Sequence, residues 1–336
     1  MNDLQEIKTA QAQTSDALAR ILRKGSISFS GAKDIRDSLL RLKVGSSLSI
    51  AELLRVSALL RVALRASDYG KRDHEPGEED DALDAMFREL APVVSLAKEI
   101  DRCILSEEEI ADDASNGLRS VRRAMKTAAE KIRTQLNSLV VNSRTYLQDG
   151  VITMRNGRYC VPVKAEHKSN VPGMVHDQSS SGSTIFVEPL SVVKLNNELR
   201  ELEIREQKEI EAVLAALSNQ TCDHLDELTL DLELIGELDF IFAKAALSRH
   251  YRGCEPRLNK DGIIRLKNAR HPLLDPHRVV PITLTLGENF DLLIVTGPNT
   301  GGKTVSLKTV GLLTLMGLAG LHVPAAEGTT LSVFNE

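Results

Sequence analysis

The sequence has no tryptophan, and aromatic residues make up only 3% of its 336 residues. It has no run approaching the roughly 18 apolar residues that a membrane-spanning helix requires. Met1 is followed by a polar stretch instead of the apolar segment of a secretion signal. We therefore expect a cytoplasmic protein with no membrane partner, and its 42% hydrophobic content is typical of a globular chain.

Cysteine is equally scarce. The four cysteines lie far apart in the sequence and form no C-x-x-C pair. This spacing argues against a zinc site or a disulfide framework and favours reduced, structural thiols. The residues concerned are Cys103, Cys160, Cys222 and Cys254.

Opposite charges are segregated along the chain, although the net charge is only −5. Residues 75–113 and 200–239 are strongly acidic. Residues 118–148 contain seven basic side chains and only one acidic side chain, Glu130. Such a basic stripe can bind phosphate groups or pair with an acidic helix, and pairing is the commoner case. We expect pairing here, with nucleic-acid contact as the alternative. The basic residues are Arg119, Arg122, Arg123, Lys126, Lys131, Arg133 and Arg144.

Most of the chain has the apolar periodicity of α-helices. Capping boxes at Ser49–Glu52 and Ser106–Glu109 predict two helix starts within residues 1–117. From Leu118 the apolar residues recur every three or four positions, which predicts a long amphipathic helix over 118–150. Two further long helices are predicted between 190 and 255.

Residues 151–189 change to a β pattern. One hairpin is predicted around Asn156-Gly157 and a second around the Ser/Gly loop 179–183. This loop follows His176 and Asp177, but the segment lacks the G-x-S-x-G pattern of a nucleophile elbow, so we interpret it as a polar turn. The result is a small β element between long helical arms.

From residue 256 the pattern becomes α/β. The runs "GIIRL", "ITLTL" and "DLLIV" are predicted strands, and the last leads into "TGPNTGGKT" at 296–304. The helix after Lys303 is apolar on almost all sides, which predicts that it is buried. Gly320 and Pro324 mark its end.

The Gly-rich stretch has the spacing of a phosphate-binding loop, from Gly297 to Gly302, Lys303 and Thr304. In such a loop the backbone N–H groups surround phosphates, the lysine neutralises the outer phosphates and the hydroxyl binds Mg²⁺. The sequence therefore predicts ATP and Mg²⁺ as cofactors. Hydrolysis also needs a carboxylate on a later strand, and the only acids after Thr304 are Glu327 and Glu336. We expect half an ATPase site that binds ATP without efficient turnover.

Four stretches together resemble a known family. They are "NGRYCVPVKAEHK" (156–168), "GMVHDQSSSGSTIFVEPLSVVKLNNELRELE" (173–203), "ARHPLL" (269–274) and "LLIVTGPNTGGKTVSLKTVGLLTLMGLAGLHVPA" (292–325). The chain is similar along essentially its whole length to the second type of the MutS family. Members continue beyond both ends of this sequence, through the rest of the ATPase domain to a nuclease-type Smr domain, so the resemblance implies a fragment without nuclease activity.

The resemblance implies a cytoplasmic homodimeric ATPase whose lever helices and clamp hold branched or distorted DNA or dock on a ribosome. Members are associated with suppressing homologous recombination and with splitting collided ribosomes. The alternative is a non-catalytic arm-and-clamp module that binds nucleic acid or a ribosome. The implied multidomain, α-rich order is a helical core (1–117), a lever helix (118–150), a β-rich clamp (151–189), returning long helices (190–255) and the first part of a P-loop ATPase domain (256–336).

The resemblance also implies binding residues. The nucleotide would be held by the loop, Thr304 would bind Mg²⁺, and His271 would lie near the adenine. Nucleic acid would meet the clamp at Arg155, Arg158, Lys164 and Lys168. The loop residues are Gly297, Pro298, Asn299, Thr300, Gly301, Gly302, Lys303, Thr304 and Val305.

Overall fold

The structure is a computed structural model that describes residues 3–71, 80–297 and 302–334. The chain forms two compact units that are discontinuous in sequence. The first unit contains residues 1–36, 58–94 and 224–336, and the second contains residues 37–57 and 95–223. Each unit combines helices with one four-stranded sheet, so the chain is α-rich as predicted.

The bounds of the described elements follow the chain. The α-helices are α1 (Leu4–Lys24), α2 (Arg36–Lys43), α3 (Ile50–Gly70), α4 (Asp84–Glu89), α5 (Val94–Cys103), α6 (Asn116–Asn142), α7 (Leu190–Cys222), α8 (Leu225–Tyr251) and α9 (Lys303–Leu318). The strands are β1 (Ile104–Ser106), β2 (Glu109–Ile110), β3 (Thr153–Arg155), β4 (Arg158–Lys164), β5 (Gly173–Gln178), β6 (Thr184–Pro189), β7 (Arg257–Asn259), β8 (Ile264–Ala269), β9 (Ile282–Leu286) and β10 (Thr330–Ser332). A short 3₁₀ segment, η1 (Ala165–Asn170), follows β4.

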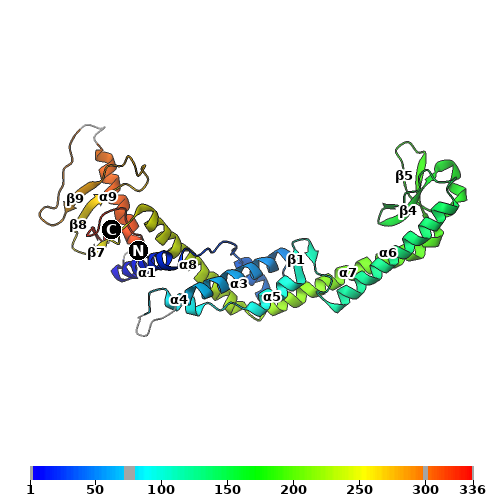
Figure 1. The fold of residues 1–336 in the computed structure, drawn as a ribbon, viewed down its shortest axis with the longest axis horizontal. Helices are drawn as coiled ribbons and strands as arrows, with labels where there is room; N and C mark the ends of the chain where they lie inside the picture. The colour runs from blue at the N-terminus through cyan, green and yellow to red at the C-terminus, as the bar shows by residue number, and fades with distance from the viewer. Residues whose placement is uncertain (1–2, 72–79, 298–301, 335–336) are drawn as a thin grey trace. The chain divides into compact units, whose positions relative to one another are not determined.

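The few aromatic residues are concentrated in the helical part of the first unit, where α1 runs along α8 (Figure 1). Phe242 of α8 is the centre of this group, with its ring centroid 5.7–6.1 Å from those of Phe29, Tyr69 and Phe87. These contacts are edge-to-face, the arrangement that the ring quadrupole favours. A core with little aromatic content is thus anchored at one point on α8.

The sheet of the first unit has the order β7-β10-β8-β9. β8 pairs antiparallel with β9 and β10, and β7 runs parallel to β10. Helix α9 packs on this sheet, with Leu313 buried against Leu266 and Leu331. The two strands predicted from "GIIRL" and "ITLTL" are confirmed as β8 and β9.

The prediction of a strand at "DLLIV" is wrong. Residues 292–295 pair with none of the described strands, and the side chains of Leu292 and Ile294 are each 74% exposed. The predicted burial of α9 is also wrong on one side, where Leu307 is 76% and Leu315 66% exposed. A buried strand needs neighbours in the sheet, and these apolar side chains have no covering layer within the described part of the chain.

The second unit is built on the long helices α6 and α7, which lie side by side with the β4–β6 region at one end of the pair (Figure 1). The predicted helix after Leu118 is confirmed as α6, and the Ser115 hydroxyl caps it by accepting from the Leu118 N–H. Ile132 and Leu136 of α6 are fully buried in a core shared with Val161 and Val187 of the sheet. The two later long helices are confirmed as α7 and α8.

The sheet of the second unit has the order β3-β4-β6-β5 and curls on itself. Both predicted hairpins are confirmed, and Asn156 (φ 52°) and Gly157 (φ 73°) form the first turn. The Asn156 side-chain amide also donates to the His176 carbonyl at 3.0 Å. Arg155 lies 3.1 Å from the Asp177 carboxylate. These contacts join β3 to β5, which stand at opposite ends of the strand order.

One capping box is confirmed and the other is wrong. Ser49 and Glu52 exchange the expected backbone hydrogen bonds at the start of α3. Ser106–Glu109, however, forms the turn of the β1–β2 hairpin. Ile104 and Ile110 are paired across this hairpin and both are buried, so apolar burial decides the conformation there.

Four free thiols are present, of which Cys103 and Cys160 are buried. Burial raises the pKa of Cys160 to about 11, so this thiol stays protonated at neutral pH. In the described part of the chain, no helix combines the length and the apolar character needed to cross a bilayer.

Gly320, just after α9, predicts a large effect of one added methyl group. Its φ is +76°, and a Cβ there would lie only 2.5 Å from the Ala10 Cβ. Gly320→Ala should therefore lower the free energy of unfolding by about 2–5 kcal/mol, through backbone strain and overpacking. Gly311→Ala is the matched control, because a Cβ at that helical glycine meets nothing within 4 Å and should stabilise α9 by about 0.5–1 kcal/mol. Equal urea midpoints for the two variants would contradict the packing described here.

Asp231 of α8 predicts a pH-dependent stability. It is fully buried, its Oδ1 accepts from the Ala91 N–H at 2.8 Å, and Oδ2 has no hydrogen-bond partner among the residues that the structure describes. Burial raises the pKa of this carboxyl to about 6. The protonated form is favoured by folding, so its stabilisation is complete below pH 4 and is lost as the pH rises through 6.

Asp231→Asn should remove this dependence, because the amide is neutral at every pH. We expect the free energy of unfolding of the unsubstituted chain to fall relative to that of Asp231→Asn by about 1–3 kcal/mol between pH 4.5 and pH 7.5. Urea unfolding at both pH values measures the difference, and parallel pH profiles would show that Asp231 is not the titrating group.

Candidate nucleotide-binding site

The start of α9 has the backbone geometry of an anion-binding turn. Gly302 precedes the helix with φ 80°, and Gly297 begins the loop with φ 139°. A Cβ at either position would meet none of the described residues within 4 Å, so these glycines serve the backbone conformation and not close packing. The Ser306 N–H bonds to the Gly302 carbonyl at 2.9 Å and closes the first turn. The N–H groups in the first turn of a helix have no intrahelical partner, so they are available to an anion.

The Lys303 ammonium donates a hydrogen bond to the carbonyl of Gly297, the first residue of the loop. Thr304 and Val305 follow in the first turn and are exposed. The remaining predicted loop residues, Pro298, Asn299, Thr300 and Gly301, lie outside the described residues. The described part of the loop thus brings together one cation, one hydroxyl and a helix N-terminus.

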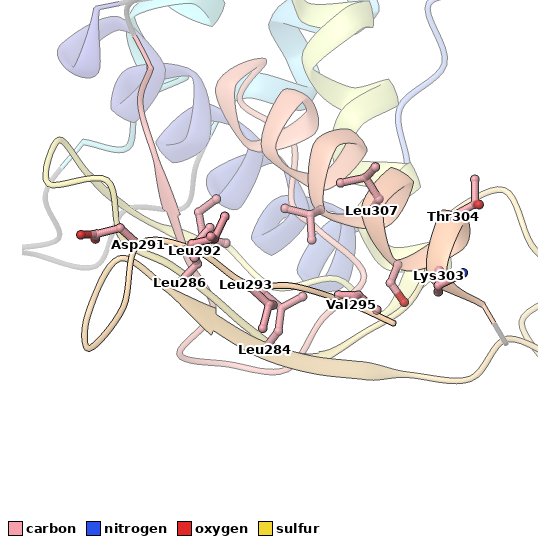
Figure 2. A pocket seen from close by; sticks show the side chains of 12 residues that line it. Leu284, Leu286, Asp291, Leu292, Leu293, Val295, Lys303, Thr304 and Leu307 are labelled. Carbon is pink, nitrogen blue, oxygen red and sulfur yellow. The ribbon is translucent and has the colours of Figure 1, made fainter. Parts of the chain in front are cut away.

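A cavity of about 490 Å³ lies between α9, β9 and residues 291–295 (Figure 2). Lys303 and Thr304 are at one end, and Asp291 is at the other. Most of its lining is apolar, including Leu284 of β9 and Leu307 of α9. A triphosphate needs N–H donors and cations, so it fits the loop at the end of this cavity, whereas the cavity itself is a packing gap beside the unpaired residues 292–295.

The described residues fit a phosphate group better than a complete metal site. Lys303 supplies charge and Thr304 supplies a hydroxyl suited to Mg²⁺. Asp291 is separated from Thr304 by the length of the cavity (Figure 2). Glu327 lines a different cavity with Arg257. Over the described ranges, no group of three or more His, Cys, Asp or Glu side chains could hold a metal ion. Glu336 lies outside the described residues.

His271 lies in the connection between β8 and β9. Its Nδ1 accepts from the Leu273 N–H at 3.3 Å, and the preceding Arg270 N–H bonds to the Pro324 carbonyl at 2.8 Å. This fixes a turn next to the segment that follows α9. His271 does not line the cavity beside Lys303, and its contact with adenine stays a prediction.

The four predicted clamp residues have different surroundings. Arg155 pairs with Asp177, and its guanidinium stacks on the Phe186 ring at 4.1 Å. Lys164 donates to the Thr145 carbonyl at 3.2 Å. Lys168 is exposed in η1.

The fourth residue, Arg158, belongs to a buried network that the sequence analysis missed. Glu188 is fully buried at the end of β6 and accepts from Arg158 at 3.1 Å and from Asn196 of α7 at 2.8 Å. Its other oxygen is 2.5 Å from His176 Nε2. The network ties three strands to α7. The available signal was one acidic residue closing the apolar run "TIFVEP".

The basic stripe of α6 is partly used in packing. Arg122 bonds to Glu206 of α7 at 2.7 Å and to Asp112 at 2.6 Å, which confirms the predicted pairing with the acidic helix for this residue. Arg119 lies 3.5 Å from Asp113. Arg123 and Lys126 are exposed on the same helix.

Curated proteins match the chain along its length, although no protein-family model matches it. Endonuclease MutS2 of Agathobacter rectalis is 54% identical over 338 residues, which is 100% of this chain and 43% of that protein. The proteins of the same name from Lachnoclostridium phytofermentans and Acetivibrio thermocellus are 53% and 46% identical, over 99% of this chain and 43% and 42% of theirs. Over its whole length, this chain is similar to part of the MutS2 proteins.

The chain spans less than half the length of these MutS2 relatives. The resemblance noted from the loop and clamp motifs is therefore confirmed at the level of the family. The nucleotide site, metal ligand and clamp contacts remain predictions about individual residues in this sequence.

The Glu188 network predicts that Glu188 is needed for folding, because it is the shared acceptor of Arg158, His176 and Asn196. Glu188→Gln keeps the side-chain volume but leaves Arg158 and His176 facing a neutral amide. It should lower the free energy of unfolding by about 2–4 kcal/mol, as expected for breaking a buried ion pair. Asp177→Asn, in the more exposed pair with Arg155, is the control and should cost less than about 1 kcal/mol. Similar urea midpoints for both variants would argue against the structural role of Glu188.

Proposed function

We propose that the turn before α9 binds ATP with Mg²⁺. The observation that carries this proposal is the arrangement of Gly297, Gly302 and Lys303. The lysine ammonium donates to the Gly297 carbonyl, and Gly302 has the left-handed conformation at the N-terminus of α9. A phosphate oxygen would replace the Gly297 carbonyl as the acceptor of Lys303. This exchange substitutes a charged acceptor for a neutral one, which strengthens the hydrogen bond.

The roles of the other residues follow from their chemistry. The N–H groups of the first turn of α9 would donate to phosphate oxygens, and the Thr304 hydroxyl would bind Mg²⁺. The Mg²⁺ ion would neutralise charge on the phosphates. The glycines allow the backbone to approach these oxygens without a Cβ in the way.

We propose weak turnover for these residues alone. Phosphoryl transfer to water requires a carboxylate for the metal and a group that orients the water. Asp291 is at the opposite end of the cavity from Thr304, which favours binding over hydrolysis (Figure 2).

The second unit supports a role in holding a large ligand. Helices α6 and α7 form a long pair that ends in the curled sheet, and Lys168, Arg123 and Lys126 provide exposed positive charge. We propose that a homodimer of the whole protein uses such arms and clamps on branched or distorted DNA, in suppressing recombination, or on collided ribosomes. ATP binding would bias the arrangement of the arms.

Lys303→Ala should weaken Mg-ATP binding at least tenfold. Loss of a hydrogen bond to a charged group costs about 1.5–3 kcal/mol, and each 1.4 kcal/mol is about a factor of ten in affinity. Lys308→Ala, an exposed lysine of the same helix, is the control for net charge and should bind normally. Isothermal calorimetry measures both, and equal affinities for the two variants would exclude the proposed phosphate contact.

A non-catalytic binding module is the second candidate function, favoured by the position of Asp291. Steady-state phosphate release by the chain distinguishes a non-catalytic module from an ATPase. We expect release no faster than that of Lys303→Ala while ATP still binds. Turnover well above that variant would show that a complete catalytic site forms and would reject the binding-only function.

A further inference from the structure

A chain of hydrogen bonds, centred on a buried imidazole, joins the segment after α9 to two other helices. His322 Nδ1 lies 2.7 Å from the Ser248 Oγ of α8, and Nε2 lies 2.9 Å from the Ser15 Oγ of α1. Ser15 Oγ in turn bonds to Glu255 Oε2 at 2.6 Å. Three segments that are remote in sequence thus meet at a single imidazole, which is 5% exposed.

The chemistry of these groups fixes the direction of each hydrogen bond. A carboxylate only accepts, so the Ser15 hydroxyl donates to Glu255 and accepts from His322 Nε2–H. His322 Nδ1 then accepts from the Ser248 hydroxyl. Burial lowers the pKa of His322, which keeps the imidazole neutral in this tautomer. All four side chains are therefore satisfied by one proton arrangement.

This arrangement is not a nucleophile triad. In a triad the carboxylate orients the imidazole, and the imidazole activates the hydroxyl. Here Glu255 contacts the Ser15 hydroxyl, and both nitrogens of His322 are occupied by serines. The geometry suits a mechanical link better than acyl transfer.

The same face of α1 contacts the chain just after α9 and the residue that precedes β7. The Thr14 hydroxyl donates to the Gly320 carbonyl at 2.7 Å, and Gln11 donates to the Pro256 carbonyl at 3.3 Å. Gly320 approaches Ala10 too closely to allow a Cβ. Positions 10, 11, 14 and 15 lie on one face of a helix. A displacement of residues 320–322 must therefore move α1 or break these contacts.

Helix α9 connects this junction directly to the proposed nucleotide site. It runs without interruption from Lys303 to Leu318, a length of roughly 24 Å at 1.5 Å per residue. Its first turn contains Lys303 and Thr304, and its last turn leads through Gly320 to His322. A helix moves as a rigid body when its hydrogen bonds are intact, so a shift at one end is delivered to the other.

We propose that His322 is a positioning residue that couples α9 to α1 and α8, so that nucleotide binding at the start of α9 alters the packing of both helices. This inference rests on the proposed nucleotide binding. The imidazole acts as a two-sided connector, since one nitrogen bonds to each helix. Loss of these bonds would uncouple α1 and α8 without removing any group that contacts the nucleotide.

Hydrogen–deuterium exchange of the full chain, with and without Mg-ATP, tests the coupling. In the unsubstituted chain we expect Mg-ATP to slow exchange within 303–318 and also within 10–21 of α1 and 245–255 around the end of α8. In His322→Phe, which keeps a ring but has no hydrogen-bonding nitrogen, the protection within 303–318 should persist. The protection within 10–21 and 245–255 should fall by at least half.

Two further variants make the test specific. Ser248→Ala removes only the Nδ1 partner, and it should lower the nucleotide-dependent protection of 245–255 even if His322→Phe folds poorly. His322→Gln can still donate to Ser15 and should restore the protection of 10–21. Tyr69→Phe is the control, because it deletes a hydrogen bond to the Gly25 carbonyl in the same unit, without a bond to α9. Its protection pattern should match that of the unsubstituted chain.

The outcomes separate this inference from the proposed function. Undiminished protection of 10–21 and 245–255 in both His322→Phe and Ser248→Ala would overturn the coupling. Equal loss in Tyr69→Phe would overturn it too, because the effect would then reflect general destabilisation. Protection of 303–318 alone in the unsubstituted chain would reject the coupling and leave the nucleotide site intact. No binding of Mg-ATP at all would reject the proposed function and this inference together.

Discussion

The contact between Gly320 and Ala10 is the constraint on which the first unit depends. It brings the chain that follows α9 so close to α1 that residue 320 has no room for a Cβ. This approach sets the position from which His322 reaches Ser15 and Ser248. It also fixes α9 over the sheet, where a Cβ on Gly317 would lie 2.6 Å from Leu331 of β10. Two glycines near the end of one helix thus determine how sheet and helices meet.

Much of the fold could be predicted from the sequence, because many of its signals are local. The Asn156-Gly157 turn requires left-handed backbone angles, and the apolar spacing after Leu118 specifies a helix whatever it packs against. The failures are places where the outcome depends on a partner. Residues 292–295 have the composition of a strand but no neighbouring strand in the described part of the chain. Ser106 fits a helix cap, yet its neighbour Ile104 is buried by pairing with Ile110.

The candidate site divides in the same way. Gly302, Lys303 and Thr304 could be found because a phosphate loop is made from consecutive residues at a helix start. Glu188 and His322 could not be found in this way, since the side chains that each one contacts lie far away in the sequence and meet it only after folding. A buried acid or imidazole gives a sequence signal of one polar letter in an apolar run, and such a letter is as common on a surface turn. The pairing of the basic helix with an acidic helix was predictable, because basic and acidic residues are clustered in separate stretches of the sequence. The individual partner of Arg122 on α7 was not.

The curled sheet of the second unit has a consequence for association with other chains. An open sheet edge presents unpaired N–H and C=O groups on which a foreign strand can add, and short edge strands and charged side chains limit this. Here β3 has only three residues, and the Asn156 side chain already occupies the His176 carbonyl of β5. The Arg155–Asp177 pair places charge at the same junction. A protein that exposes a β element at the end of a long helix pair is thereby protected from strand-by-strand aggregation at its tip.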